Sequence, residues 1–311
     1  MKKRAVVALG GNALIKEGQD GNIYDQFENT REATQSFVKM VKQGWDIVVT
    51  HGNGPQVGAI LLQNDLAKDV TPPMPLGICV AESEGYIGYM IQQCLSNQLR
   101  KTNIFKPVIT LITQVLVDEN DNSLKNPTKP IGPYYDDKEK KDLIKEGYKL
   151  IHQKDGWRIV VPSPDPKAIV EGEIIKKMLE DDIIVIASGG GGMPVIEQEG
   201  WGLNGLEAVI DKDLAAERLA EAVNADLLLI LTNVEFVYLN YNSPKQKALK
   251  NVKISDLKKY YEQGQFPVGS MGPKILSAFR FFKSGGKKVI ISSVEKGWDA
   301  LIGKTGTHIT N

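Results

Sequence analysis

Three glycine-rich turns follow short apolar runs of the sequence, a pattern that is typical of anion binding. The turns read GGNA at residues 10–13, HGNGP at residues 51–55 and SGGGG at residues 188–192. Glycine lets the backbone approach an anion closely, and amides at the start of a helix point toward it with a favourable dipole. A tight turn alone explains one such motif, but three at matching positions predict a phosphate or small-anion site.

Three lysines occur in settings that favour the same chemistry. Lys212 stands between Asp211 and Asp213, Lys274 follows a glycine–proline pair at the start of a helical pattern, and Lys129 lies between two prolines. A cation at a helix N-terminus costs about 0.3–1 kcal/mol unless an anion lies nearby. Phosphoryl transfer depends on neutralising the moving group, so these lysines are candidate catalytic residues. The two aspartates could hold the lysines or a Mg²⁺ ion on nucleotide phosphates.

Other signatures of phosphate and metal chemistry do not fit the sequence. No GxGxxG follows the first apolar run, and protein-kinase signatures are missing. The GKT at residues 303–305 ends like a Walker A loop, but Trp298 stands where its first glycine belongs. The three histidines, His51, His152 and His308, are far apart and belong to no HExxH motif, so no transition-metal site is predicted.

Composition indicates an ordinary globular chain. Of the 311 residues, 38 are Lys or Arg and 38 are Asp or Glu, and this balance argues against a nucleic-acid partner. The apolar run at residues 5–9 is too short for a signal peptide, and no stretch is long enough for a membrane helix. Cys79 and Cys94 lack CxxC spacing and are expected to be reduced and buried. We therefore expect a soluble, cytoplasmic protein.

Short β-branched runs alternate with longer helical patterns along the chain. This alternation predicts an α/β fold with a mainly parallel sheet covered on both faces. In residues 214–223 an apolar stripe indicates a helix, which Asp213 could cap. The predicted strands are residues 4–9, 46–51, 106–112, 158–161, 183–187, 226–231 and 287–291, and the predicted helices are residues 30–42, 55–66, 86–99, 168–179, 214–223 and 273–282.

Residues 118–159 do not follow this alternation of strand and helix patterns. They are polar, rich in lysine and proline, and long for a loop within a compact domain. We interpret them as an inserted subdomain at one edge of the sheet. Because ligands of an open α/β sheet bind outside the carboxyl ends of its strands, the glycine turns are expected to meet there.

The sequence resembles the amino acid kinase superfamily in all three glycine turns. Several further blocks are similar to the carbamate kinases in particular, and they extend over nearly the whole chain. These blocks are residues 125–133 (KNPTKPIGP), 158–164 (RIVVPSP), 207–213 (EAVIDKD) and 269–274 (GSMGPK). The resemblance implies reversible phosphoryl transfer between ATP and carbamate, giving ADP and carbamoyl phosphate, with ATP synthesis in arginine fermentation as the usual role.

The resemblance also implies an architecture and partners. It implies a single domain over residues 1–311, an open αβα sandwich with a mainly parallel central sheet and a small protruding subdomain. Residues 1–187 would bind carbamate or carbamoyl phosphate, and residues 188–311 would bind the nucleotide. A homodimer and dependence on Mg²⁺ follow in the same way, with the ion held mainly by the nucleotide phosphates.

Roles of individual residues follow from matching the family's motifs. Lys129, Lys212, Lys274, Asp211 and Asp213 would be catalytic. Substrate would be bound at Gly10, Gly11, Asn12, Gly52, Asn53, Gly54, Gly189 and Gly190. The nucleotide would be bound at Lys212, Thr232, Asn233, Val234, Tyr241, Pro267, Val268, Gly269, Met271 and Lys274.

One departure from the wider superfamily bears on substrate. Many acetylglutamate and glutamate kinases carry a lysine two residues before the glycine pair, where this chain has Ala8. The missing charge must come from Lys129 or Lys212, which favours a carbamate kinase. The alternatives are another superfamily enzyme acting on acetylglutamate, glutamate or UMP, and a non-catalytic sensor of nucleotide or carbamoyl phosphate.

Overall fold

An eight-stranded, almost entirely parallel sheet forms the centre of the molecule. The computed structural model describes residues 2–16, 18–153 and 155–311. Only the pairing of β16 with β17 is antiparallel among the described strands of this sheet. The strand order is β15 (Asn251–Lys253), β17 (Thr307–Thr310), β16 (Lys288–Ser293), β12 (Leu227–Thr232), β1 (Lys3–Leu9), β2 (Trp45–His51), β9 (Ile184–Ile186) and β3 (Val108–Thr110).

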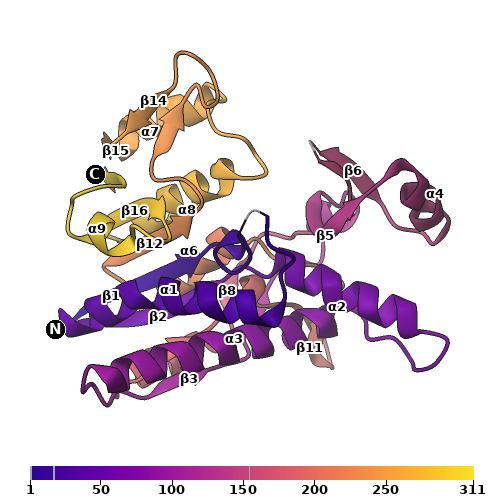
Figure 1. The fold of residues 1–311 in the computed structure, drawn as a ribbon, viewed down its shortest axis with the longest axis horizontal. Helices are drawn as coiled ribbons and strands as arrows, with labels where there is room; N and C mark the ends of the chain where they lie inside the picture. Colours follow the sequence, from indigo (N-terminus) through magenta and orange to yellow (C-terminus); the bar gives the residue numbers. More distant parts are fainter. Residues whose placement is uncertain (1, 17, 154) are drawn as a thin grey trace.

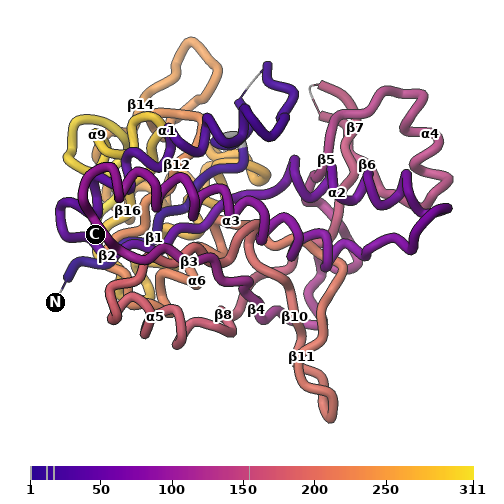
Figure 2. Tube along the Cα trace, turned by 60° about the horizontal axis from the view of Figure 1, so that its bottom comes forward, coloured from indigo at the N-terminus to yellow at the C-terminus, as the bar shows by residue number. Residues whose placement is uncertain are grey.

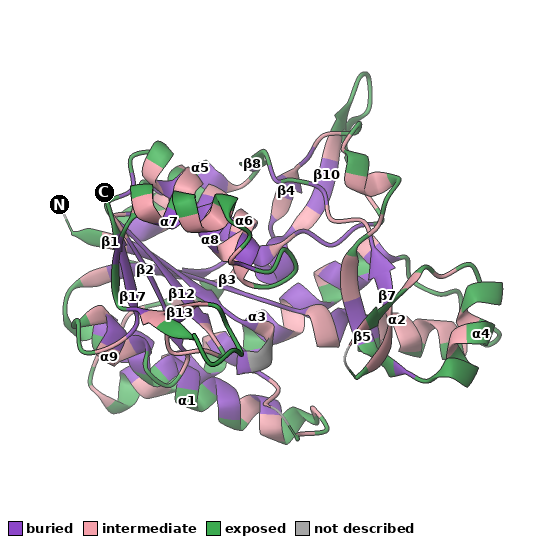
Figure 3. Cartoon of the chain, turned by 90° about the horizontal axis from the view of Figure 1, so that it is seen from above, coloured by how far each residue is buried: buried purple, intermediate pink, exposed green. Residues whose placement is uncertain are grey.

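Helices cover both faces of this sheet (Figure 1). On one face lie α1 (Ile23–Lys42), α3 (Leu76–Lys101) and α9 (Gly297–Leu301), and on the other α5 (Gly172–Glu180), α6 (Lys212–Ala222) and α8 (Met271–Lys283). Neighbouring residues of a central strand therefore enter opposite cores: Val7 packs with the first set and Val6 with the second. This double burial explains why the strands read as continuous apolar runs in the sequence. Figure 3 shows that the strands at the centre of the molecule are buried. The predicted αβα sandwich is confirmed.

The inserted subdomain projects from this sandwich beside α2 (Gly54–Ala67), as Figure 1 shows. It contains a three-stranded antiparallel sheet in the order β5 (Lys129–Tyr135), β7 (Gly156–Val161) and β6 (Leu150–Gln153), together with α4 (Asp137–Lys145). Asp136 caps α4 in a reciprocal capping box with Glu139. Residues 158–161 do form a strand, as predicted, but they belong to β7 of the subdomain's antiparallel sheet and not to the main sheet. Ile159 and Val161 instead bury against α2 in the subdomain's own core.

Smaller elements complete the fold. A second sheet has the order β11 (Gly202–Gly205), β10 (Met193–Gln198), β4 (Gln114–Leu116) and β8 (Ala168–Ile169), and its β10–β11 hairpin extends away from the body (Figure 2). β13 (Val237–Leu239) pairs with β14 (Lys247–Leu249), and α7 (Ile254–Glu262) follows β15. The helix predicted at residues 168–179 begins at Gly172, because its first residues pair as β8.

Two further expectations concerned the state of the cysteines and the presence of a membrane helix. Cys79 and Cys94 are both buried on α3 and form no disulfide, as expected. Among the described residues, no helix combines the length and apolar character needed to cross a membrane.

Candidate active site

The predicted glycine turns meet at the carboxyl ends of β1, β2 and β9. Together with α6, α8 and the base of the subdomain they line a polar cavity of about 310 Å³. The cavity-lining glycines among the predicted residues are Gly10, Gly11, Gly52, Gly54, Gly190 and Gly269. Position 12 lies in the short 3₁₀ helix η1 (Gly11–Ala13), but the Asn12 side chain is outside the described part of the structure.

The first two turns pack against each other through bare backbone. The Gly10 amide donates to the Leu231 carbonyl at 2.8 Å, and the Gly52 amide donates to the Leu9 carbonyl at 2.9 Å. A Cβ atom at Gly52 would lie only 2.8 Å from the Gly11 amide nitrogen. Glycine is therefore required at position 52, because any side chain would push the two anion-binding turns apart.

The third turn, η3 (Gly189–Gly191), is held from behind by a buried carboxyl group that sequence analysis missed. Glu84 of α3 accepts hydrogen bonds from the amides of Gly189, at 2.8 Å, and Thr113, at 3.2 Å. Burial raises the pKa of Glu84 to about 8. Both Gly189 and Gly190 are buried, but only Gly190 of the two lines the cavity. Glu84 thus fixes the turn through its backbone and does not line the cavity.

Asn53 and His51 complete this buried layer. The Asn53 side chain donates to the Ser83 hydroxyl at 2.8 Å, and a Cβ atom at Gly190 would lie 2.1 Å from its amide nitrogen. Burial lowers the pKa of His51 to about 4, so its imidazole is neutral at physiological pH. The His51 ring is fully buried and hydrogen-bonded to the Gly52 carbonyl. It supports the turn and is not placed to exchange protons with substrate.

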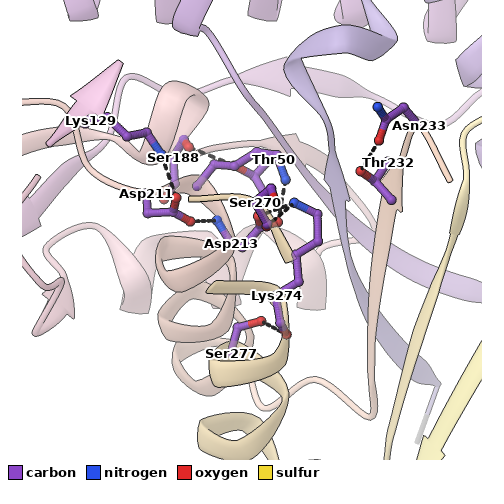
Figure 4. Close-up of polar contacts among 11 residues, drawn as sticks. Thr50, Lys129, Ser188, Asp211, Asp213, Thr232, Asn233, Ser270, Lys274 and Ser277 are labelled. Atoms are coloured by element: carbon purple, nitrogen blue, oxygen red, sulfur yellow. Dashed lines mark hydrogen bonds and ion pairs between the residues drawn. The ribbon is translucent and has the colours of Figure 1, made fainter. Parts of the chain in front are cut away.

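The predicted lysines and aspartates form an ion-paired cluster beside the cavity, in two groups that a hydrogen bond from the Asp213 amide to Asp211 joins (Figure 4). Asp211 binds Lys129 with Oδ2 at 2.5 Å from Nζ. Asp213 binds Lys274, with 2.9 Å between Oδ2 and Nζ, and its other oxygen binds Lys212. Three segments that are distant in the sequence therefore present their ammonium groups to one site.

The start of α6 explains how the two aspartates divide their roles. Asp211 is the N-cap, and its Oδ1 accepts from the Asp213 amide at 2.9 Å. The prediction that Asp213 caps this helix was wrong, because the helix begins at Lys212. Asp213 instead lies in the first turn, where its carboxylate is buried between two lysines and free of any capping role.

Nearby lysines keep the carboxylates of Asp211 and Asp213 ionised. Burial opposes ionisation of Asp213, but Lys212 and Lys274 outweigh it and hold the Asp213 pKa below its usual value. Asp211 behaves alike: burial raises its pKa, Lys129 lowers it, and the net pKa is lowered. Burial lowers the pKa of Lys212 despite Asp213, while Asp213 overcomes burial and raises the pKa of Lys274. The ammonium group of Lys212 therefore depends more on a nearby anion than that of Lys274 does.

An apolar pocket of about 160 Å³ adjoins the polar cavity. The two share Thr232, Asn233, Ser270 and Lys274. Val234, Tyr241, Pro267 and Met271, all predicted to bind nucleotide, line the apolar pocket together with Tyr238. Val268 was predicted there too, but it is 89% exposed and lines neither space. Tyr238, Gln265 and Phe266 are lining residues that sequence analysis missed.

Arg158 also lines the polar cavity, although sequence analysis did not single it out. It projects from β7 into the polar cavity, near Lys129 and Pro130 of β5. Its position at the head of the RIVVPSP block was a signal that was available but not used.

Glycine turns at the carboxyl edge of a parallel sheet, facing lysines across a polar cavity, define a phosphotransferase. A model of the amino acid kinase family matches residues 3–293. The carbamate kinase of Pyrococcus horikoshii is 52% identical over 314 residues, covering 100% of both chains. The structure of carbamate kinase from Giardia lamblia bound to AMP-PNP has a TM-score of 0.91 and 43% identity, covering 99% of this chain and 98% of that chain.

A more distant structure shares the architecture alone. UMP kinase from Ureaplasma parvum has a TM-score of 0.54 at 14% identity, with 100% of both chains covered. The chain belongs to the amino acid kinase family and, within it, to the carbamate kinases.

Proposed function

We propose that the protein catalyses reversible phosphoryl transfer between ATP and carbamate, giving ADP and carbamoyl phosphate. The observation that carries the proposal is the ion-paired cluster of three lysines and two aspartates in the glycine-lined cavity, with Lys274 also reaching the apolar pocket. A phosphoryl group in transit would lie where the cavity and the pocket adjoin. Preorganised cations there stabilise its charge, and each contributes roughly 2–4 kcal/mol to lowering the barrier.

The two spaces suggest how substrates are divided. The apolar pocket, with Tyr238, Tyr241 and Met271, suits a nucleoside, and the shared residue Lys274 would meet its phosphates. The glycine turns suit carbamate and the phosphate of carbamoyl phosphate. Lys129 approaches from the subdomain and supplies charge on the side where Ala8 offers none.

Mg²⁺ fits this site as a companion of the nucleotide. Both oxygens of Asp213 bind lysines, and those of Asp211 bind Lys129 and a backbone amide. Each carboxylate is thus already engaged, so the ion would be held mainly by phosphate oxygens, as Mg²⁺ commonly is. When bound, Mg²⁺ would neutralise charge on the phosphates.

We further propose that the enzyme works in the cytoplasm as a homodimer, and that it runs toward ATP synthesis in arginine fermentation. These proposals rest on the similarity to carbamate kinases and, for the dimer, on an exposed sheet edge described below. Removing magnesium with a chelator should abolish turnover and leave the fold intact.

An assay for ATP formed from ADP and carbamoyl phosphate tests the proposed reaction. The same protein should give no phosphorylated product from ATP with acetylglutamate, glutamate or UMP. Turnover of one of these and not of carbamoyl phosphate would reassign the enzyme within its family. Tight binding of ADP or carbamoyl phosphate without any turnover would instead indicate a sensor.

A further inference from the structure

Among the described residues, four cations line the polar cavity, and Arg158 differs from the other three. Lys129, Lys212 and Lys274 are each ion-paired with Asp211 or Asp213. Arg158 forms no ion pair with any carboxylate among the described residues. The three lysines carry only one more charge than their two aspartates, so Arg158 contributes much of the cavity's positive excess.

The guanidinium of Arg158 is held in place but mostly unused. Its Nη2 donates to the Gly132 carbonyl at 2.8 Å, and its Cζ lies 5.4 Å from the centre of the Tyr134 ring. Nε is buried and has no hydrogen-bond partner within the described parts of the chain. A guanidinium has five N–H donors in a planar fork, so most of them remain available. Leaving such a group desolvated and unpaired is costly unless an anion binds it.

The burial of Arg158 also indicates that its guanidinium binds an anion. Desolvation lowers its pKa, and the groups that partly offset this effect are Tyr134 and Tyr135, with no acid among them. An anion entering the cavity therefore meets one cation that no aspartate already neutralises. The fork geometry of a guanidinium matches the two oxygens of a planar carboxylate, which a lysine cannot match.

We infer that Arg158 is a substrate-binding residue that takes the carboxylate of carbamate and the corresponding oxygens of carbamoyl phosphate. This inference rests on the proposed function and assigns the recognition of the small substrate to a strand of the subdomain. Lys129 and Arg158 lie on the neighbouring strands β5 and β7. The subdomain would thus provide both a catalytic cation and a cation that selects the substrate.

The test compares Arg158→Met with wild type in the synthesis of ATP from ADP and carbamoyl phosphate. We expect KM for carbamoyl phosphate to rise by at least about 30-fold, because charge-assisted hydrogen bonds are lost. KM for ADP should stay within about twofold, while kcat should fall as well, because the carboxylate charge that Arg158 binds develops only as the phosphoryl group leaves. Arg158→Lys keeps the charge but loses the planar fork of N–H donors. Its KM for carbamoyl phosphate should therefore lie between those of wild type and Arg158→Met, about 5–10-fold above wild type.

A control variant and a rescue experiment separate binding from folding. Lys140→Met removes a subdomain cation that lies 3.4 Å from the centre of the Trp157 ring, outside the cavity, and should leave both KM values unchanged. In Arg158→Ala, guanidinium chloride should restore activity, and sodium chloride at equal ionic strength should not. If Arg158→Met fails to fold, the Lys variant and this rescue decide the question.

Two outcomes would overturn the inference. A purely structural Arg158, needed only to hold the Gly132 carbonyl, would misplace Lys129, so its loss would lower kcat with KM for carbamoyl phosphate unchanged. Normal kinetics in every Arg158 variant would remove it from the site. Wild-type protein that makes no ATP from carbamoyl phosphate would instead contradict the proposed function, so the two failures are distinguishable.

Discussion

Asp213 organises the site at the scale of single residues. Its two oxygens hold Lys212 and Lys274 together although both ammonium groups carry the same charge. Like charges placed this close repel each other, so the buried carboxylate between them is what makes the arrangement stable. An entering phosphoryl group can then meet both lysines without any rearrangement, which is the condition for strong electrostatic catalysis.

Removing either lysine should therefore affect turnover much more than folding. We expect Lys212→Ala and Lys274→Ala each to lower kcat by at least about 100-fold, since one preorganised contact contributes roughly 2–4 kcal/mol. Steady-state kinetics and circular dichroism measure the two effects. Lys287→Ala is the control, because Lys287 pairs with Asp226 at the opposite end of the sheet. Near-normal turnover in a folded variant would remove that lysine from the mechanism.

Glu217 should give stability an unusual pH dependence. It lies on α6 one turn after Asp213, is fully buried, and neither of its oxygens has a hydrogen-bond partner among the described residues. Burial raises its pKa from 4.5 to about 7. The folded state therefore binds this proton more tightly than the unfolded state, so the stability it confers is lost as pH rises from about 4.5 to about 7.

Glu217→Gln should remove this loss. We expect its free energy of unfolding at pH 8 to exceed that of wild type by about 1–3 kcal/mol, with a smaller difference at pH 5. Urea unfolding at the two pH values measures it. Glu262→Gln is the control, since Glu262 lies exposed on α7 and pairs with Lys258, away from Glu217. Equal effects at both pH values would mean that Glu217 ionises normally.

At the scale of elements, a contact between two glycines docks the subdomain onto the sandwich. A Cβ atom at Gly58 of α2 would lie 2.0 Å from the Gly132 Cα atom of β5. Gly132 has a φ of +70° and also provides the carbonyl that holds Arg158. The close approach sets the position of β5, and so the distance from Lys129 to Asp211. No larger residue fits at position 58 unless the two elements separate.

Gly58→Ala should consequently lower activity through geometry alone. We expect kcat to fall by about 10-fold or more while ADP affinity stays near wild type, because small misplacements of a catalytic cation are costly. Kinetics and calorimetry measure these quantities. Gly85→Ala on α3 is a matched control, since its Cβ would meet only the Ile112 side chain at 3.9 Å. Unchanged kcat in Gly58→Ala would show that the subdomain tolerates displacement.

At the scale of the whole molecule, the central sheet ends in an open edge at β3. Ile109 of this strand is 38% exposed, and Tyr89 of the adjoining α3 is 54% exposed. A parallel-sheet edge with apolar side chains beside it is a natural surface for a second copy of the chain. This surface is where we place the proposed dimer contact.

Sedimentation should therefore give twice the 34.3 kDa mass of one chain. Ile109→Lys should shift the protein toward monomer, because it buries a charge at the contact. Ile302→Lys is the control, since Ile302 is also partly exposed but follows α9, far from β3 in the sheet order. A wild-type monomer would contradict the dimer, and an unaffected Ile109→Lys dimer would place the contact elsewhere.

What the sequence by itself determined is mainly local. The strands at residues 4–9, 46–51 and 226–231 were predicted within one residue of their observed bounds, because strands buried on both faces leave an uninterrupted apolar run. The glycine turns were recognisable for a similar reason: the backbone conformation and close approach they require depend on the residue type itself. The parallel sheet then brought the turns to one edge.

Only the tertiary structure decided which residues meet. Lys129 and Asp211 are 82 positions apart, and Lys274 and Asp213 are 61 positions apart, so no local pattern relates them. Resemblance to a family suggested these residues, but their pairing depends on how the subdomain and α8 pack around α6. Sequence analysis did not identify Glu84 or Arg158, because what matters is a neighbour that is distant in the sequence. For Glu84 this neighbour is the Gly189 amide, and for Arg158 it is the polar cavity. Such contacts between distant segments arise only when burial of the apolar cores, including that of the subdomain, fixes the elements in place.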